Sequence, residues 1–235
     1  MPNIFDNITD DTRLGLALVD SLKDFDTVDV ATGYFDLRGW STFADIIDTK
    51  PTPAPGARAT ARILVGMIAP AEPEQLLNSL QDQVQPPAYG SDIHDREKAL
   101  ARRDRLVKHL RTQLMRGLAT ASGQKTLQTL KRQLHDGLVD MKVFTEKPLH
   151  GKTYIFHAPD KKHGSCWAYV GSSNLTGAGL HHNLELNIDV QDSDATTKLA
   201  TWFDERWTDP FSLTITEEII DLIADSWADD KQPTP

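Results

Sequence analysis

The sequence predicts an α/β protein in which a mixed β-sheet is sandwiched between helices. Two observations support this class. The first half of the 235-residue chain alternates apolar β-branched runs with helical periodicity, whereas four strand-like runs cluster between residues 138 and 190. A chain of this length can bury one large core. We therefore expect a single domain over residues 1–228, followed by a disordered tail or linker at 229–235.

The first half of the chain is expected to contain two strands and two helices. Leucines spaced four apart, preceded by a pair of aspartates that offer a cap, predict an amphipathic helix over residues 10–24. Apolar β-branched runs predict strands at 28–35 and 61–68, with a second helix at 37–48. Repeated proline makes residues 49–57 a surface loop.

Helices and then strands follow. A short helix is expected at 72–84 and a long one at 93–120; after a break at Ser122-Gly123 comes a helix at 124–137, which Gly137 ends. The later runs and helices are expected as strands at 138–146, 152–158, 165–171 and 184–190 and helices at 192–207 and 216–228.

Charge is distributed unevenly along the chain. The net charge is −9, but residues 96–135 hold 11 Lys and Arg against two acidic residues, so this part of a basic helical segment at about 92–136 carries +9. Two interpretations remain open. The segment either grips a phosphate backbone, with Arg102, Arg103 and Arg105 as substrate contacts, or forms a solvated face matched to an acidic neighbour.

Several functional classes are disfavoured by composition. No apolar run approaches the roughly 18 residues of a membrane span, and the N-terminus lacks a basic segment followed by an apolar one, so we expect a cytoplasmic protein that contacts no membrane. The single cysteine, Cys166, is expected to be a buried side chain rather than a nucleophile. The histidines lack a metal-ligand spacing, and neither a metal nor a cofactor is expected.

The stretch at 147–190 concentrates chemically active side chains. Residues i and i+2 of a strand face the same side, so His150 and Lys152 would offer a nucleophile and a cation together. The turn Gly171-Ser172-Ser173-Asn174 supplies hydroxyl, amide and backbone donors for phosphate oxygens. Glu185, between two leucines on the next run, would hold the histidine ring in one tautomer.

These residues resemble a known motif. His150-Gly151-Lys152 followed 19 residues later by Gly171-Ser172-Ser173-Asn174 is similar to the H-x-K…G-S-x-N motif of the phospholipase D superfamily. ATGYFDLRGW, at 31–40, resembles the first strand and turn of phospholipase D-like nuclease domains in restriction endonucleases and helicase-associated proteins. That turn would bring Tyr34 to the same cleft as a substrate contact.

The resemblance implies a covalent mechanism without a metal. His150 would attack phosphorus to give a phosphohistidine, which water hydrolyses. Lys152 and Asn174 would bind the non-bridging oxygens, assisted by Ser172 or Ser173.

Two features depart from the family pattern. The aspartate usual five residues after the lysine is replaced by His157, and the motif occurs once. Leaving-group protonation needs a second histidine, which single-motif relatives obtain by pairing two subunits. We therefore expect a homodimer in which His150 of the other chain is the general acid.

The leading hypothesis is a metal-independent phosphodiesterase that cleaves nucleic acid, with DNA expected, as the nuclease part of a restriction, defence or helicase-associated system. The sequence lacks a G-x-x-x-x-G-K-[ST] loop, so a helicase or ATPase would be another domain or partner. The alternatives are a non-catalytic nucleic-acid-binding or dimerisation module, and a phospholipid-cleaving phosphodiesterase, which would require a membrane-facing surface.

Overall fold

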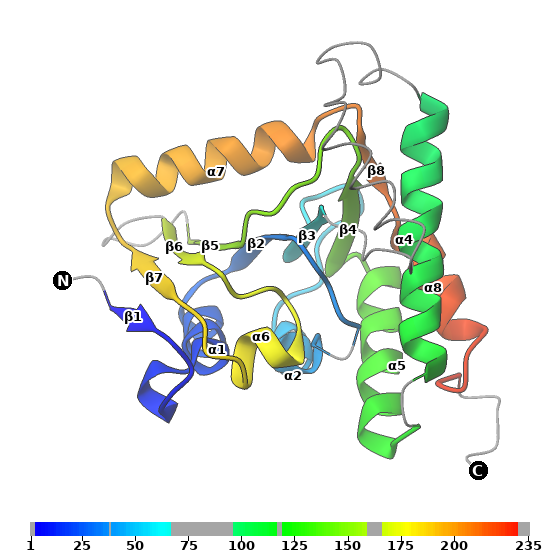
Figure 1. Ribbon diagram of the computed structural model, residues 1–235, viewed down its shortest axis with the longest axis horizontal. Helices are drawn as coiled ribbons and strands as arrows, with labels where there is room; N and C mark the ends of the chain where they lie inside the picture. The colour runs from blue at the N-terminus through cyan, green and yellow to red at the C-terminus, as the bar shows by residue number, and fades with distance from the viewer. Residues whose placement is uncertain (1–2, 38, 67–95, 117–118, 159–165, 230–235) are drawn as a thin grey trace, which may run out of the picture.

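The computed structural model describes residues 3–37, 39–66, 96–116, 119–158 and 166–229, and these form one eight-stranded sheet flanked by helices (Figure 1). The strand order is β1-β7-β6-β5-β2-β3-β4-β8. The strands are β1 (Ile4–Phe5), β2 (Thr27–Thr32), β3 (Ala61–Val65), β4 (Val139–Phe144), β5 (Thr153–His157), β6 (Cys166–Gly171), β7 (Asn187–Val190) and β8 (Ser212–Thr214).

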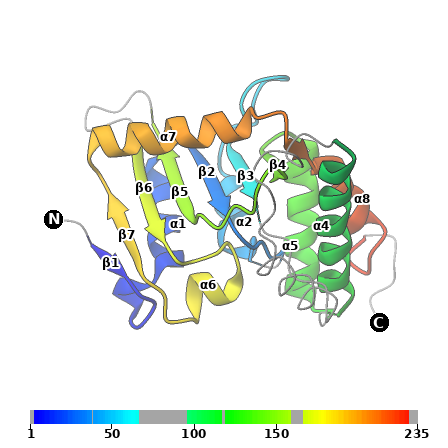
Figure 2. The same cartoon turned by 45° about the horizontal axis from the view of Figure 1, so that its top comes forward.

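Helices lie on both faces of this sheet, which confirms the predicted α/β class. In both overall views α7 crosses one face, α1 and α2 lie on the opposite side, and α4, α5 and α8 gather beside β4 and β8 (Figure 2). None of the described helices has the length and apolar content to cross a lipid bilayer. The helices are η1 (Asp10–Thr12), α1 (Leu14–Asp24), α2 (Ser41–Ile47), α4 (Arg96–Arg116), α5 (Ala121–His135), α6 (Gly177–His181), α7 (Ser193–Trp207) and α8 (Thr216–Ala224).

The sheet is mixed, and its pairing brings the motif together. β2, β3 and β4 run parallel, whereas β5 is antiparallel to both β2 and β6. Thr153, the first residue of β5, pairs with Ala31 near the end of β2 and with Val170 near the end of β6. The residues just before β5 and just after β2 and β6 therefore share one edge of the sheet.

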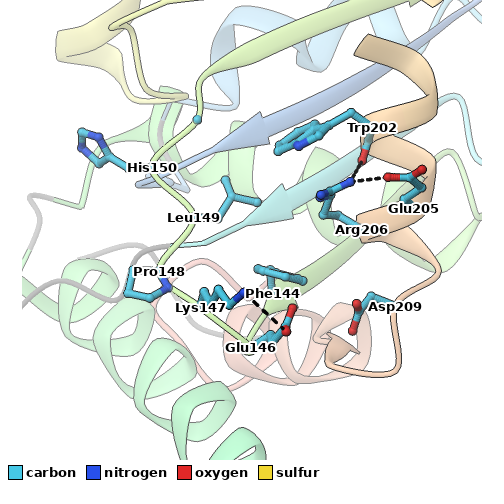
Figure 3. A pocket seen from close by; sticks show the side chains of 11 residues that line it. Phe144, Glu146, Lys147, Pro148, Leu149, His150, Trp202, Glu205, Arg206 and Asp209 are labelled. Atoms are coloured by element: carbon cyan, nitrogen blue, oxygen red, sulfur yellow. Dashed lines mark hydrogen bonds and ion pairs between the residues drawn. The ribbon is translucent and has the colours of Figure 1, made fainter. Parts of the chain in front are cut away.

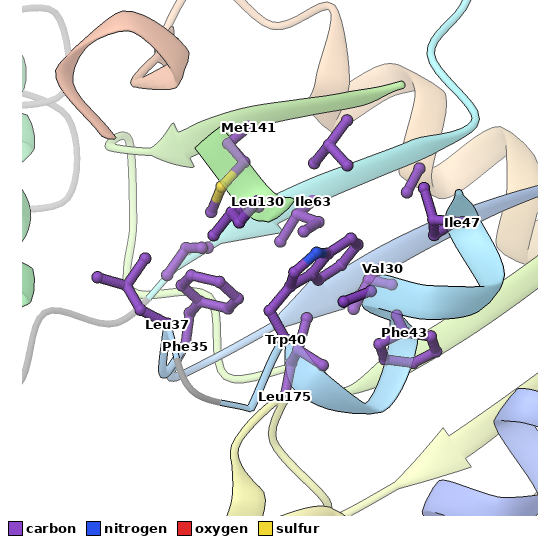
Figure 4. Packing of buried hydrophobic residues seen from close by; sticks show 14 of the residues in the cluster. Val30, Phe35, Leu37, Trp40, Phe43, Ile47, Ile63, Leu130, Met141 and Leu175 are labelled. Carbon is purple, nitrogen blue, oxygen red and sulfur yellow. The ribbon is translucent and has the colours of Figure 1, made fainter. Parts of the chain in front are cut away.

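The turn that follows β2 is fixed by core packing. Phe35, Leu37 and Trp40 are buried in the larger hydrophobic cluster, where Trp40 lies close to Phe43 (Figure 4). The Trp40 Nε1 donates a hydrogen bond of 2.7 Å to Oε1 of Gln133 on α5. The GYFDLRGW turn thus joins the sheet to two helices, and Phe35 belongs to the core.

Two predicted helix boundaries were wrong because local turns supply different caps. Asp10 and Asp11 lie in η1, and the amide of Leu14 at the start of α1 donates instead to Oδ1 of Asn7, at 2.9 Å. Ser122-Gly123 does not break a helix. It lies in the first turn of α5, where Gly123 N donates to Thr120 Oγ1 at 3.1 Å.

Gly137 follows α5 with φ of 73°, the left-handed conformation expected of a glycine that ends a helix. Other elements differ in extent from the prediction. The short elements β1, α6 and β8 lacked a sequence signal, and the predicted strand 184–190 is regular only from Asn187. The helix expected at 72–84 lies outside the described residues.

Candidate active site

His150 lies on a loop that crosses the sheet edge from β4 to β5 and is anchored on both sides. The Arg102 guanidinium on α4 donates to the carbonyl oxygens of Thr145 and Glu146. Leu149 is buried, and its amide donates to the Gly66 carbonyl at 3.2 Å. An added Cβ on Gly66 would lie 2.1 Å from Leu149 Cβ. The exposed His150 is therefore presented by a backbone with little room to shift.

Lys152 is bonded to the backbone of His150. Its side chain is buried, and Nζ donates a 2.8 Å hydrogen bond to the His150 carbonyl oxygen. Burial lowers the pKa of the Lys152 ammonium group, and the negative charge of Glu185 acts in the opposite direction. The ammonium group is thus held at the His150 backbone, and the negative charge of Glu185 acts against the effect of burial on its pKa.

The Gly-Ser-Ser-Asn turn closes the other side of the edge, and two of its residues are structural. A Cβ on Gly171 would lie 2.2 Å from the Leu186 carbonyl oxygen, so glycine allows β6 and β7 to approach. Ser173 is fully buried, and its hydroxyl accepts a 2.9 Å hydrogen bond from Asn187 Nδ2. The burial of Ser173 argues against its predicted substrate contact, whereas Gly171 is half-buried and its contact stays a prediction.

Asn174 is oriented by the loop that follows β2. Its Oδ1 accepts hydrogen bonds from the Tyr34 amide at 2.9 Å and from Thr32 Oγ1 at 3.5 Å. Among the described residues, Nδ2 has no hydrogen-bond partner. The acceptor end of this amide is therefore used to hold the loops together. Tyr34 takes part through its backbone.

Ser172 and Glu185 form a hydrogen-bonded pair. The Ser172 hydroxyl donates to Oε2 of Glu185 and accepts from the Leu186 amide at 2.9 Å. Asn183 Nδ2 donates to the other carboxylate oxygen at 3.4 Å. Within the described part of the chain Glu185 makes no hydrogen bond to His150. Its predicted role in fixing the histidine tautomer stays a prediction, and its negative charge acts to raise the pKa of Lys152.

The three arginines expected to contact substrate lie on α4 in different environments. Arg102 braces the loop before His150, as described above. Arg103 forms ion pairs with Asp104 at 3.0 Å and with Glu218 on α8 at 3.1 Å. Arg105 is exposed and donates to the Ala101 carbonyl oxygen of its own helix. Of the three, Arg105 is the one whose charge faces solvent without an acidic partner among the described residues.

A pocket of about 470 Å³ lies against the loop that carries His150. The His150 imidazole points away from the Trp202, Glu205 and Arg206 side chains on the opposite wall, so the ring lies on the other side of the loop (Figure 3). The lining residues are Phe144, Glu146, Lys147, Pro148, Leu149, His150, Gly151, Trp202, Glu205, Arg206 and Asp209.

His157, which stands where the family has an aspartate, ends β5 at the edge opposite His150. His157 is five residues beyond Lys152, which amounts to about 16 Å along an extended chain. Its Nε2 lies 2.8 Å from Oδ2 of Asp29 on β2, a buried carboxylate that also binds Arg62 at 2.7 Å. Burial tends to raise the pKa of Asp29, but hydrogen bonds from Arg62 and His157 outweigh this effect and lower it. A carboxylate therefore lies next to position 157, but it belongs to Asp29 on the neighbouring strand β2.

Other candidate residues have structural environments. Burial raises the pKa of the Cys166 thiol to about 11, which disfavours the reactive thiolate. His181 is hydrogen-bonded to Thr42 and packs on Gly15. No group of three or more His, Cys, Asp or Glu side chains arranged for a metal occurs among the described residues.

The sequence match decides the family to which this site belongs. A family model described as "Cardiolipin synthase, PLD-like domain" matches residues 89–207, which include the whole of the motif from His150 to Glu185. The chain belongs to the phospholipase D superfamily. This phospholipase D-like chain contributes one motif, at the sheet edge where β2, β5, β6 and β7 meet. No curated protein matches the chain.

Solved structures of similar fold cover nearly the whole chain. NucT from Helicobacter pylori is 10% identical, with a TM-score of 0.46, and covers 91% of this chain and 98% of its own. Nuc from Salmonella typhimurium, a phospholipase D family member, is 9% identical with a TM-score of 0.47 and the same coverage. The archaeal chromatin protein TrmBL2 is 10% identical, has a TM-score of 0.38 and covers 88% of this chain and 52% of its own. Membership in the phospholipase D superfamily rests on the sequence match.

Proposed function

We propose that the protein is a metal-independent phosphodiesterase that cleaves nucleic acid, with DNA as the expected substrate. The observation that carries the proposal is the convergence of His150, Lys152 and Asn174 at one sheet edge. An exposed imidazole, a buried ammonium group and an amide donor held by its oxygen are the parts needed to attack a phosphodiester and to stabilise the charge that develops.

The proposed reaction has two steps. A His150 ring nitrogen attacks phosphorus, so that a P–N bond forms while the P–O bond to the leaving group breaks. Lys152 and the Asn174 amide bind the non-bridging oxygens, with the Ser172 hydroxyl beside them. A general acid protonates the departing oxygen; water then attacks phosphorus, breaks the P–N bond and returns the free histidine.

The general acid is proposed to come from a second copy of the chain. The described contacts of the motif residues include no second histidine. In a twofold dimer that joins the two sheet edges, the partner's His150 would protonate the leaving group and later accept a proton from water. A lysine in place of a metal makes the reaction independent of divalent cations.

The substrate class is supported by the charge of α4. Arg105 and Lys108 are exposed on this helix, which also anchors the loop that carries His150. Part of the basic segment is matched to acidic neighbours instead: Arg103, Arg111, Lys131 and Arg132 pair with Glu218, Asp225, Asp229 and Asp48. Both interpretations of the basic segment thus apply to different residues, and a smaller set remains to attract phosphate.

A setting for this activity is part of the proposal. The resemblance to restriction and helicase-associated nuclease domains favours a cytoplasmic role in restriction, phage defence or a helicase-linked system. Any ATPase would be supplied by another domain or partner.

The deciding experiment is cleavage of labelled single- and double-stranded DNA in EDTA by the wild-type protein and by His150→Ala. We expect the wild type to cut and the variant to lose at least about 100- to 10,000-fold in rate, since both nucleophile and proton donor are removed. Brief reaction followed by denaturation should trap phosphorus on the wild type alone. Equal binding of DNA by both proteins without cleavage would instead identify a nucleic-acid-binding module.

A further inference from the structure

The strand β7 and the residues before it have an inverted distribution of polar and apolar side chains. Asn187 and Asp189 are buried, whereas the alternating residues Leu184, Leu186 and Ile188 are 77%, 64% and 40% exposed. A strand at the margin of a soluble sheet normally buries its apolar side and exposes its polar side. Here the apolar side is the one left in water.

The buried polar residues are fully used, so this register is not accidental. Asn187 Nδ2 donates to Ser173 Oγ and to the Phe5 carbonyl oxygen, at 2.9 and 3.1 Å. Asp189 accepts from the backbone and side-chain nitrogens of Asn3, at 2.6 and 3.1 Å. Shifting the strand by one residue would bury the leucines and break these hydrogen bonds. The strand is therefore held with its apolar side outward.

The exposed residues extend onto the neighbouring strand. Ile4 of β1 is directly opposite Ile188 in the antiparallel register, and opposed side chains lie on the same face of a sheet. Ile4 is 57% exposed. Ile4, Leu184, Leu186 and Ile188, here named the apolar stripe, thus form a continuous surface. Single exposed apolar residues are ordinary, but a contiguous group of them marks an interaction site.

The apolar stripe also adjoins the candidate active site. Leu186 exchanges two hydrogen bonds with Ser172: its carbonyl accepts from the Ser172 amide at 3.0 Å, and its amide donates to the Ser172 hydroxyl at 2.9 Å. Glu185, whose charge acts on Lys152, lies between two members of the stripe. Anything that covers the stripe is consequently brought to the edge of the sheet where His150 is exposed.

We propose that the apolar stripe is the surface through which two copies of this chain associate. The inference rests on the proposed function, because the shared-site mechanism needs a second histidine at this edge. A second copy offers the same aliphatic surface and also supplies the missing group. Nucleic acid is a poor alternative occupant, since the aliphatic side chains of the stripe gain little from a phosphate backbone and the Glu185 carboxylate lies between two of them.

The test compares Leu186→Asp with Met115→Asp by sedimentation and by cleavage of DNA. Met115, on α4, is 67% exposed and lies outside the stripe, which makes it the matched control for Leu186. We expect the wild type and Met115→Asp to sediment as dimers of the 26.2 kDa chain. Leu186→Asp should raise the dimer dissociation constant at least tenfold, keep the circular dichroism of the folded chain, and lose cleavage in proportion to the dimer lost.

Activity of Leu186→Asp should return at high protein concentration, as mass action requires. Leu184→Asp, at the most exposed stripe position, repeats the test if Leu186→Asp does not fold. If neither change affects the dimer, the apolar stripe is not the dimer interface, and the proposal of a shared active site is unaffected. A fully active wild-type monomer would overturn both proposals. A wild-type dimer that dissociates on Leu186→Asp but never cuts any phosphodiester would support the stripe and overturn the proposed function.

Discussion

Lys152 is the residue in which burial and catalysis act against each other. A buried ammonium group loses hydration, which lowers its pKa, yet the proposed chemistry needs it charged. Glu185 offsets this effect through its negative charge and is itself fixed by Ser172. In the proposed mechanism the Ser172–Glu185 pair would keep Lys152 protonated, a role that requires no contact with the substrate.

We predict that Glu185→Gln narrows the pH range of activity on its alkaline side. Activity should fall as pH rises through the pKa of Lys152, which burial places below the ordinary value of 10.5. Removing the Glu185 charge withdraws the effect that raises this pKa, so the alkaline limb should move to lower pH. The measurement is the pH–rate profile on an aryl phosphodiester, which avoids alkaline melting of DNA.

Glu205→Gln is the control for this prediction, because Glu205 lies on the far wall of the pocket, where Arg206 pairs with it. It should leave the alkaline limb in place. An unchanged limb in Glu185→Gln would show that the carboxylate does not act on the ionisation of Lys152.

At the scale of elements, the loop from β4 to β5 is positioned by its neighbours rather than by its own sequence. Arg102 on α4 holds its first residues, and Leu149 packs against Gly66 at the end of β3. Lys152 then binds the His150 carbonyl oxygen. Two elements distant in sequence, together with Lys152 of the loop itself, thus hold the backbone at His150, and a change in any of them should lower the rate.

We predict that Gly66→Ala displaces this loop. The added Cβ would lie 2.1 Å from Leu149 Cβ and 2.6 Å from the Leu149 carbonyl oxygen, distances that force the backbone to move. A shift of this size should lower kcat by about 100-fold, because catalytic groups tolerate displacements of less than about 1 Å. Overpacking should also lower the free energy of unfolding by about 1–3 kcal/mol.

The matched change is Gly177→Ala, since a Cβ there would have no heavy atom within 4 Å. Kinetics and denaturant unfolding of both variants check the prediction. Wild-type kcat in a folded Gly66→Ala protein would contradict the view that this contact positions His150.

At the scale of the whole molecule, a chain with a single motif needs the second histidine from another subunit. We predict that His150→Ala subunits inactivate wild-type subunits when the two exchange. If one subunit in ten is wild type, random pairing leaves about one dimer in a hundred with two intact histidines, so activity per wild-type subunit should fall about tenfold. The same mixture without an exchange step should keep its activity. Activity proportional to the wild-type fraction after exchange would refute the shared site.

The alternation of strands and helices and the motif from His150 to Glu185 were readable from the sequence. Local hydrophobic periodicity determines an element's type, and alternation along a strand determines which residues share a face. The same rule was wrong for His150 and Lys152, which were expected on one face of a strand: both lie in the loop before β5, where His150 is exposed and Lys152 is buried. Short elements such as β1 and β8 were missed because two or three residues carry no usable periodicity.

Only the tertiary structure decided which of the motif's neighbours are free to act. Ser173 is buried and bonded to Asn187, and Arg102 binds the loop before His150. His157 is hydrogen-bonded to Asp29, which is 128 residues away in the sequence. The exposure of Leu186 likewise could not be predicted from the sequence. Alternation along a strand shows which residues share a face, but not which face is covered. Local patterns fix elements and their faces, whereas pairing between distant strands fixes partners, burial and charge.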